Sequence, residues 1–243
     1  MLGEPVWHNP DAYRRIGLVP EREATYPFLS GYEFVLLSAK LHGLPKPHEA
    51  AKRAIQAVDM EAVQQRALGG YSKGMKQRMK VASALVHHPQ VLLLDEPFNG
   101  MDPRQRLHMM DLLREVAAQG RTVVFSSHIL EEVERLAENV LVIIAGRLAA
   151  SGDFRVIRKL MTDRPHTFTL RSSDNRRLAS ALVADRSVVG VELDSERLSV
   201  RTSEFASFTL AAPRLARAEG IRLLELLPTD ESLESVFSYL MKR

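Results

Sequence analysis

The sequence predicts an α/β protein in two parts, a parallel sheet layered with helices over residues 1–163 and a small α+β module over residues 164–243. In the first part, short apolar strands alternate with amphipathic helices, which is the pattern of a layered α/β domain. The run Val91–Leu94 is apolar without interruption, as expected of a strand buried on both faces of a parallel sheet. After Arg164 and Pro165 the expected strands are short and alternate in polarity, which indicates a separate module.

The first part opens with one strand and a group of helices. Ser30 and Glu33 have the spacing of a capping box, and apolar residues follow them at helical intervals, so a helix should begin there. Gly43 and Pro45 should end that helix. We expect these helices to form a helical subdomain over about residues 28–88. The elements expected here are a strand at 15–19, the helix that begins near Gly31, and helices at 48–58 and 79–85.

The remainder of the first part continues the alternation. Asp102 followed by Pro103 is a favourable helix start, with Asp at the N-cap and Pro at the first helical position, and Gly120 should end the helix. Residues 122–125 predict another buried strand. The elements expected after it are a helix at 129–137 and a strand at 140–144.

The second part has the order strand, helix, strand, strand, helix, strand, helix. This order suggests a small α+β module of the ferredoxin-like type. The expected strands are 167–170, 188–193, 198–201 and 221–227, and the expected helices are 178–183, 205–218 and a closing helix at 232–240.

Composition excludes several classes of function. The 33 basic and 30 acidic residues give a net charge of only +3, which does not argue for a nucleic-acid binder. The absence of cysteine excludes disulfides, thiolate zinc sites and cysteine nucleophiles. No apolar run approaches the roughly 18–20 residues that span a bilayer, and no signal peptide is visible, so a membrane role should come through a partner.

The strongest chemical signal is a pair of acids at the end of a strand. Asp95 and Glu96 follow Val91–Leu94 directly, at the carboxyl end of the strand, where open parallel sheets bind their ligands. Adjacent side chains on a strand point to opposite sides, so one carboxylate could reach a metal and the other a water. The alternative is a strand end with two solvated acids.

Three further segments surround this pair in the sequence. Residues 71–78 lie one helix upstream and contain Ser72 and Gly74, which could be a plain N-capped turn. Asp102 lies just downstream, where it could serve only as a helix cap. His128 follows the next strand, and a single histidine there could be an ordinary polar residue.

Together, the order and spacing of these four segments resemble the nucleotide-binding domain of ABC transporters, over most of residues 13–151. Among the residues at matching positions, the resemblance makes Glu96 the base that polarises the attacking water and His128 the switch residue that touches the γ-phosphate. It places Asp95 and Glu21 at Mg²⁺, with Glu21 where the Q-loop of the family usually has Gln. The residues that it assigns to ATP are Tyr71, Ser72, Lys73, Gly74, Gln77 and Asp102, which include the signature and D-loop positions.

The resemblance also implies the wider biology. It predicts a P-loop NTPase-like parallel sheet with a helical signature subdomain, and ATP and Mg²⁺ as cofactors. It implies a dimer, either with a second copy or with another ABC ATPase, and integral membrane permease subunits as partners, with no nucleic acid. The variants at Glu21, Lys73 and Met75 are similar to those of ABC-2 type exporters, so export from a cytoplasmic position on the inner face of the cell membrane is expected.

One part of the family pattern is missing from the sequence. A site of this type needs G-x-x-x-x-G-K-S/T to hold the phosphates, and no such run is present. Residues 69–76 come near it, but Met75 stands where Lys belongs. We therefore expect a fold that is incomplete at its N-terminus through truncation, with residues 2–6 resembling the strand and turn after a P-loop helix. Sheet edges and apolar faces should be exposed.

Two other functions stay open on the sequence alone. The chain could be a non-catalytic remnant, or a partner that donates only its signature segment and binds ATP weakly or not at all. A soluble ABC protein that acts on nucleic acid or ribosomes is a third possibility, which the small net charge and the single cassette disfavour.

Overall fold

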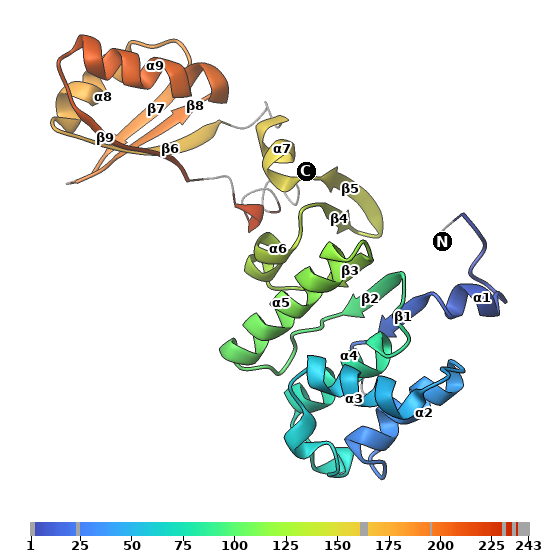
Figure 1. Ribbon diagram of the computed structural model, residues 1–243. Coiled ribbons are helices and arrows are strands. Elements are labelled where there is room, and N and C mark those ends of the chain that lie inside the picture. The colour runs from blue at the N-terminus through green and yellow to red at the C-terminus, as the bar shows by residue number, and fades with distance from the viewer. Residues whose placement is uncertain are drawn as a thin grey trace. The chain divides into compact units, whose positions relative to one another are not determined.

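The structure, a computed structural model of the 243-residue chain, describes residues 3–22, 25–160, 165–194, 196–229, 232–234 and 237. The chain divides into two compact units, Met1–Ile129 and Leu130–Arg243 (Figure 1). The domain boundary predicted between residues 163 and 164 lies outside the described residues and stays a prediction. No helix among the described residues is both long enough and apolar enough to cross a membrane.

The first unit contains a parallel sheet of three strands in the order β1–β2–β3 (Figure 1). The register places Leu18 beside Leu93 and Leu93 beside Val124. The parallel α/β architecture predicted from the sequence is therefore confirmed. The strands are β1 at Ile16–Val19, β2 at Val91–Asp95 and β3 at Thr122–Ser126.

Helices make up most of the rest of the first unit. Ser30 accepts a hydrogen bond from the Glu33 backbone N–H, and the Glu33 carboxylate accepts one from the Ser30 backbone N–H, so the predicted capping box is confirmed. The third predicted helix starts earlier than residue 79, because Ser72 caps it. The helices are α1 at Pro10–Tyr13, α2 at Gly31–Leu41, α3 at Pro47–Ala57, α4 at Lys73–Leu85 and α5 at Pro103–Ala118, with 3-10 turns at Glu61–Val63 and Leu68–Gly70.

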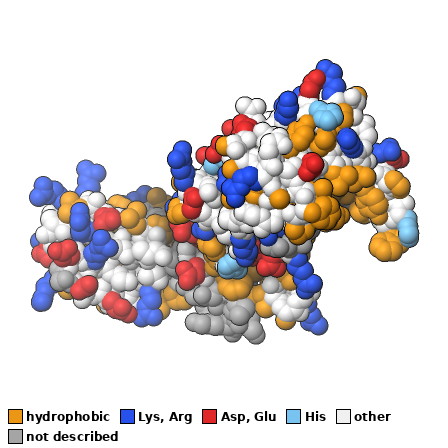
Figure 2. Space-filling view, turned by 90° about the horizontal axis from the view of Figure 1, so that it is seen from below, with side chains coloured by type: hydrophobic (Ala, Val, Ile, Leu, Met, Phe, Trp, Pro, Cys, Tyr) orange, Lys and Arg blue, Asp and Glu red, His pale blue; other side chains and the backbone are white. Residues whose placement is uncertain are grey.

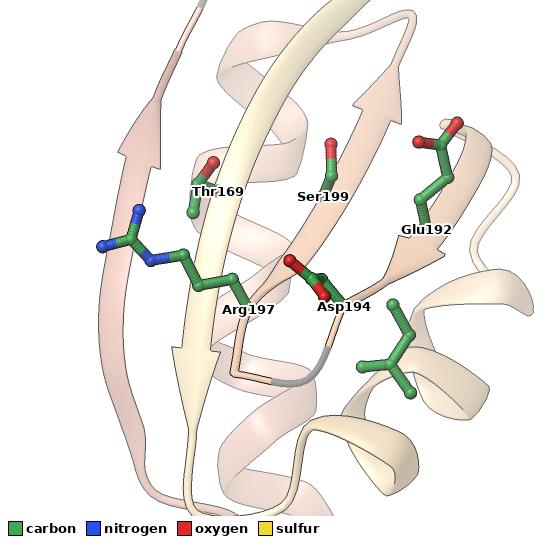
Figure 3. A pocket seen from close by; sticks show the side chains of 6 residues that line it. Thr169, Glu192, Asp194, Arg197 and Ser199 are labelled. Atoms are coloured by element: carbon green, nitrogen blue, oxygen red, sulfur yellow. The ribbon is translucent and has the colours of Figure 1, made fainter.

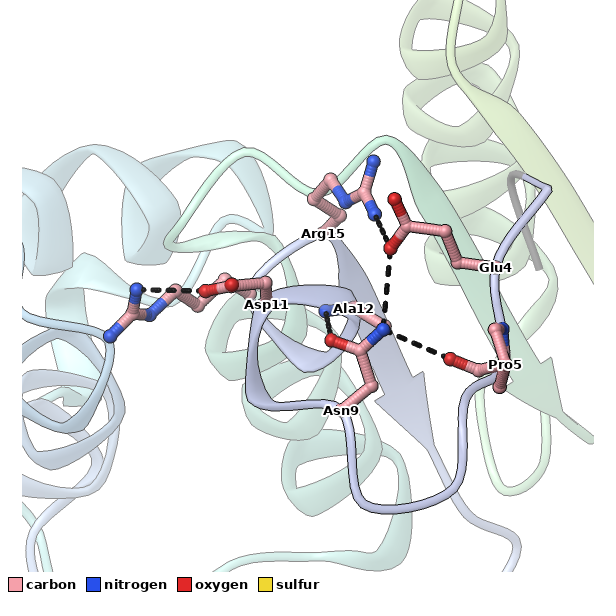
Figure 4. A network of polar contacts seen from close by, with 7 residues as sticks. Glu4, Pro5, Asn9, Asp11, Ala12 and Arg15 are labelled. Atoms are coloured by element: carbon pink, nitrogen blue, oxygen red, sulfur yellow. Dashed lines mark hydrogen bonds and ion pairs between the residues drawn. The ribbon is translucent and has the colours of Figure 1, made fainter.

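A small polar network holds the segment that leads into β1 (Figure 4). The side-chain oxygen of Asn9 accepts a hydrogen bond of 3.1 Å from the Ala12 backbone N–H and caps α1. The side-chain amide of Asn9 donates to the Pro5 carbonyl at 3.0 Å and to the Glu4 carboxylate at 3.3 Å. Arg15 donates to the same carboxylate at 3.2 Å. The described residues before α1 form turns, without the strand expected near residues 2–6.

β1 lies directly against α4, and Gly17 permits this close approach. A Cβ atom at Gly17 would lie 2.5 Å from the Ala84 carbonyl oxygen and 2.8 Å from the Leu92 Cδ1. The first of these neighbours is helix backbone, which cannot swing aside as the end of a side chain can. Glycine at this position therefore fixes the distance between α4 and the sheet.

One face of the three-stranded sheet is open. Leu18 is 63% exposed and Val124 46% exposed, and both stand in one row with Leu93 across the sheet. Among the described residues, no strand pairs with the outer edge of β3. The prediction that residues 122–125 form a fully buried strand is wrong, because β3 is an edge strand whose alternate residues face outward. The predicted exposure of a sheet edge and an apolar face is present.

Two histidine rings stack where α2 and α4 end. The rings of His42 and His87 are parallel within 4°, with their centroids 3.6 Å apart. His87 Nε2 lies 3.1 Å from the Ile16 carbonyl oxygen, which assigns the ring proton to Nε2. Burial lowers the pKa of His87 to about 4, with a further lowering from His42 and His88. Burial and the nearby Arg14 also lower the pKa of His42, so both rings are neutral at pH 7.

We expect the protein to lose stability as the pH falls from 6.5 towards 4. In this window the unfolded chain binds a proton at His87 that the folded protein does not, so the free energy of unfolding falls with pH. The ring is partly exposed, and solvent screening reduces this contribution to about 1–2 kcal/mol. Urea denaturation at several pH values measures it. The dependence of the free energy of unfolding on pH should become weaker in His87→Gln and stay unchanged in His108→Gln, the control at an exposed histidine. The same pH dependence in both variants would show that His87 is not its cause.

The second unit begins with a hairpin and two short helices. Val140, Val142, Phe154 and Leu233 form its small buried cluster. The prediction of a helix near residues 129–137 and a strand at 140–144 is confirmed, whereas the helix at 154–160 was not predicted. Most of the predicted closing helix at 232–240 lies outside the described residues. The elements are α6 at Leu130–Leu136, β4 at Val140–Ile144, β5 at Arg147–Gly152 and α7 at Phe154–Leu160.

The rest of the second unit is a four-stranded antiparallel sheet with two helices (Figure 1). Its order, β7–β8–β6–β9, is the ferredoxin-like order that the sequence predicts. Phe168, Leu178 and Phe208 belong to its core and are fully buried. The elements are β6 at His166–Ser172, α8 at Asn175–Val183, β7 at Val188–Leu193, β8 at Leu198–Thr202, α9 at Phe205–Ala218 and β9 at Leu223–Pro228.

Candidate functional site

The two predicted acids lie at the carboxyl end of β2. Asp95 is the last residue of the strand, and Glu96 leaves it with φ of 48°. This left-handed conformation is rare for a residue other than glycine and costs roughly 1–3 kcal/mol. The simple alternation expected of adjacent strand residues therefore ends at Asp95, and a backbone turn aims the Glu96 side chain.

The Glu96 carboxylate is held by His128. The His128 backbone N–H donates to Oε1 at 3.0 Å, and His128 Nδ1 lies 2.9 Å from Oε2. The Glu96 side chain is 17% exposed, whereas that of His128 is 72% exposed. The structure thus brings together the two residues predicted to be catalytic, with the acid sheltered and the imidazole open to solvent.

Ser126, at the end of β3, joins the two acids and was not predicted as a site residue. Its hydroxyl donates to Asp95 Oδ1 at 2.5 Å and accepts from the Glu96 backbone N–H at 3.1 Å. The register pairs Asp95 with Ser126, so parallel pairing brings the hydroxyl to this edge. The sequence shows a serine at the end of a predicted strand. It does not show that this strand pairs with β2, so it could not identify Ser126 as a site residue.

Gln77 of α4 fixes the backbone of the same turn. Its side-chain amide donates to the Glu96 carbonyl oxygen at 3.2 Å, and its side chain is buried. Gln77 therefore reaches the site from inside the protein, as a support for Glu96. The prediction that it contacts ATP stays untested, and its side chain faces the protein rather than solvent.

The predicted signature segment forms the start of α4. Ser72 caps the helix by accepting a hydrogen bond of 3.2 Å from the Met75 backbone N–H, and both Ser72 and Lys73 are exposed. A Cβ at Gly74 would lie 2.5 Å from the Gly100 carbonyl oxygen, so the helix start packs tightly against the loop after β2. Exposed backbone N–H groups at a helix N-terminus favour an anion.

Among the contacts of the described residues, none joins Asp102, Tyr71 or Glu21 to the pair of acids. Asp102 is exposed and caps α5, accepting a hydrogen bond of 2.9 Å from the Gln105 backbone N–H. Tyr71 is buried and donates its hydroxyl hydrogen bond to the Val63 carbonyl at 2.6 Å, and burial raises the pKa of its phenol. Glu21 is exposed just after β1. A role for Tyr71 in contacting ATP stays a prediction, and its side chain supports the helical subdomain.

The Asp95 carboxylate is a suitable ligand for a magnesium ion that is also bound by phosphates. No group of three or more His, Cys, Asp or Glu residues able to hold a metal is found among the described residues. Mg²⁺ is usually bound by one or two carboxylates together with substrate phosphates and water, rather than by a cage of protein ligands. Asp95 is an exposed carboxylate oriented by Ser126, which is the kind of ligand this arrangement needs.

A pocket also lies on the open face of the β6–β9 sheet (Figure 3). Most of its lining side chains are polar, and none belongs to the predicted site. It is lined by Thr169, Glu192, Leu193, Asp194, Arg197 and Ser199. We assign it no part in the chemistry of Asp95 and Glu96.

We expect Ser126→Ala to lower the free energy of unfolding by about 1–2 kcal/mol, because the Glu96 N–H and the Asp95 carboxylate lose a shared partner. Ser126→Thr keeps the hydroxyl and should retain most of the stability. Urea denaturation of the three proteins measures the difference. A Ser126→Ala protein as stable as the original would show that this bridge contributes nothing.

Comparison with known proteins identifies the family. The family model described as ABC transporter matches residues 3–99. The linearmycin resistance ATP-binding protein LnrL of Bacillus subtilis is 31% identical over 240 residues, covering 96% of this chain and 76% of LnrL. The Nod factor export ATP-binding protein I of Burkholderia thailandensis is 37% identical over 161 residues, covering 65% of this chain but only 53% of that protein.

A solved structure supports the same assignment. The structure described as the ATP-binding subunit of an ABC transporter superposes with a TM-score of 0.59 and 28% identity, over 65% of this chain and 67% of the solved chain. Sequence and fold therefore agree, and the chain belongs to the family of ABC transporter ATP-binding proteins.

Proposed function

We propose that the chain is the ATP-binding and ATP-hydrolysing subunit of an ABC exporter. The observation that carries this proposal is the way Glu96 is held. Its N–H, its carbonyl and both carboxylate oxygens are engaged by Ser126, Gln77 and His128, in a strained backbone conformation beside Asp95. Such strain persists where the surrounding structure maintains it, and it clusters at active sites.

In the proposed mechanism, the Glu96 carboxylate accepts a hydrogen bond from the attacking water and orients it towards the γ-phosphate. His128 holds that carboxylate through Nδ1, and the protonated ring would also donate to the γ-phosphate from Nε2. Asp95 would hold Mg²⁺, directly or through water, and the bound ion would supply positive charge beside the phosphates. Catalysis of this kind depends on positioning and electrostatics.

The phosphate-binding loop is proposed to come from a strand–loop–helix segment that adds to the sheet. The outer edge of β3, which pairs with no strand among the described residues, would accept the further strand, and its helix would cover the open row of Leu18, Leu93 and Val124. The carboxyl ends of parallel strands share one edge, so the loop would lie beside Asp95 and Glu96.

The proposed partners are a second ATPase subunit and integral membrane permease subunits. Ser72 and Gly74 would face the γ-phosphate bound by the other subunit. Hydrophobic side chains gather at the surface in Figure 2. In the helical subdomain, Phe28 is 78% exposed and Leu41 79% exposed, with Tyr26 51% exposed. We propose that these residues face the permease and that the subunit lies on the cytoplasmic face of the membrane.

Export is proposed from the names of the relatives. One is described as a linearmycin resistance protein and another as a Nod factor export protein. The second name states export, and the first is compatible with it. The chain matches only about half of the second protein, so the direction of transport here is a proposal.

Calorimetry with ATP and Mg²⁺ tests the proposed site. The chain is compared with a chimera in which a segment bearing G-x-x-x-x-G-K-S/T, between a strand and a helix, is joined ahead of residue 3. Several charge-assisted hydrogen bonds of about 1.5–3 kcal/mol each should make the chimera bind at least about 100-fold more tightly. Equal affinity of both proteins would refute the proposed origin of the phosphate-binding loop.

A further inference from the structure

A buried lysine in α4 grips the segment that follows β1. Lys80 is only 6% exposed. Its Nζ lies 2.7 Å from the Pro20 carbonyl oxygen, 3.3 Å from that of Glu21 and 3.2 Å from that of Arg22. These three carbonyl oxygens match the three N–H donors of an ammonium group. The ammonium group of Lys80 is therefore hydrogen-bonded inside the protein. One of the three residues that it contacts is Glu21, a predicted metal ligand.

Packing alone does not account for this arrangement. A lysine near a surface usually extends its ammonium group into water and buries only its alkyl stem. Lys80 does the opposite, and burying a charge is costly unless it is paired or hydrogen-bonded. An apolar residue would avoid that cost but could not donate to these carbonyl oxygens, so it is the ammonium group that holds them.

Lys80 is one of two polar anchors on the same side of α4. Gln77, three residues earlier, holds the Glu96 carbonyl after β2 at 3.2 Å, while Lys80 holds the carbonyls after β1. Residues three apart on a helix share a face. A single helix, α4, which Ser72 caps, therefore holds the turns that follow two adjacent strands.

We propose that Lys80 is a positioning residue that fastens residues 20–22 to α4, so that Glu21 and the Ser72 turn move as one body. The inference rests on the proposed function for the roles of Glu21 and Ser72. The contact of Lys80 with the carbonyls of residues 20–22, which we call the clamp, can be measured without nucleotide. Its partner is the backbone, so it sets the place of the Glu21 carboxylate whatever that side chain binds.

Limited proteolysis with trypsin tests the clamp in the full chain. Trypsin attacks the Arg22 carbonyl, which Lys80 holds, so Lys80→Met should speed cleavage after Arg22 by about tenfold or more, as expected for a locally released segment. Cleavage at other arginines should not change. Lys80→Arg keeps a charged donor and should restore slow cleavage. Lys52→Met, at an exposed lysine of α3, is the matched control. An unchanged rate after Arg22 in Lys80→Met overturns the proposal.

Amine labelling of the unmodified protein keeps the test decisive if Lys80→Met fails to fold. An acylating reagent under native conditions should modify Lys80 at least about 100-fold more slowly than Lys52, because the buried ammonium is hydrogen-bonded to three carbonyls. Mass spectrometry of the peptides gives both rates. Equal rates would mean that the clamp does not form in solution.

A catalytic measurement separates positioning from stability. In a transporter assembled with the chimera that carries the phosphate-binding loop, Lys80→Met should raise the Mg²⁺ concentration for half-maximal hydrolysis about tenfold. It should leave the affinity for ATP unchanged and be rescued by Lys80→Arg. An unchanged Mg²⁺ dependence overturns the positioning role. If the assembly hydrolyses no ATP at all, the proposed function fails, whereas proteolysis and labelling still decide whether Lys80 clamps residues 20–22.

Discussion

In an assembled transporter that contains the chimera with the phosphate-binding loop, replacing Glu96 with Gln should reduce ATP hydrolysis by about 100-fold or more, because the side chain can no longer accept a proton from the attacking water. The substitution keeps the size of the side chain. The Gln carbonyl can still accept from the His128 backbone N–H, and the Gln amide can donate to His128 Nδ1. The affinity for ATP should therefore stay within about twofold of its original value.

The matched control is Glu115→Gln, at an exposed acid of α5 that takes no part in the site. It should leave both hydrolysis and binding unchanged. Phosphate release measures hydrolysis, and calorimetry measures binding. If Glu96→Gln hydrolyses ATP at the original rate, Glu96 is not the residue that orients water. If it loses binding and hydrolysis together, Glu96 supports the structure of the site rather than its chemistry.

Replacing Gly17 with Ala should lower the free energy of unfolding by about 2–3 kcal/mol. The new Cβ would lie 2.5 Å from the Ala84 carbonyl oxygen, so β1 and α4 would have to move apart. The movement would also disturb Lys80, which lies one turn earlier on α4, and the carbonyls it holds. Urea denaturation measures the loss of stability.

Gly70→Ala is the control for Gly17→Ala. At Gly70 a Cβ would meet only the end of the Arg66 side chain, at 3.8 Å, and the residue is exposed. Its effect on the free energy of unfolding should stay below about 0.5 kcal/mol. A Gly17→Ala protein as stable as Gly70→Ala would mean that β1 and α4 are not packed as closely as described.

Local signals in the sequence predicted most of the fold. The capping box at Ser30, the Asp102 helix start and the Val91–Leu94 strand each depend on a few neighbouring residues, and each is found in the structure. The burial of β3 was predicted wrongly, because burial depends on what lies beside a strand. The apolar pattern predicted a strand at residues 122–125, but it did not predict that this strand lies at the edge of the sheet.

The candidate site could be predicted only in part for the same reason. Asp95, Glu96 and His128 belong to recognisable segments, and the structure brings them together. Ser126 and Lys80 act through contacts between residues far apart in the chain. Their roles depend on strand order and on the direction of a helix, which no local pattern of residue types contains.

The positive φ of Glu96 raises the question of why this position holds a glutamate rather than a glycine. Glycine would adopt φ of 48° without the torsional penalty that an L-residue suffers. It would, however, leave the His128 backbone N–H and Nδ1 without the carboxylate that they contact. The acid therefore keeps His128 in place at the expense of an unfavourable backbone torsion.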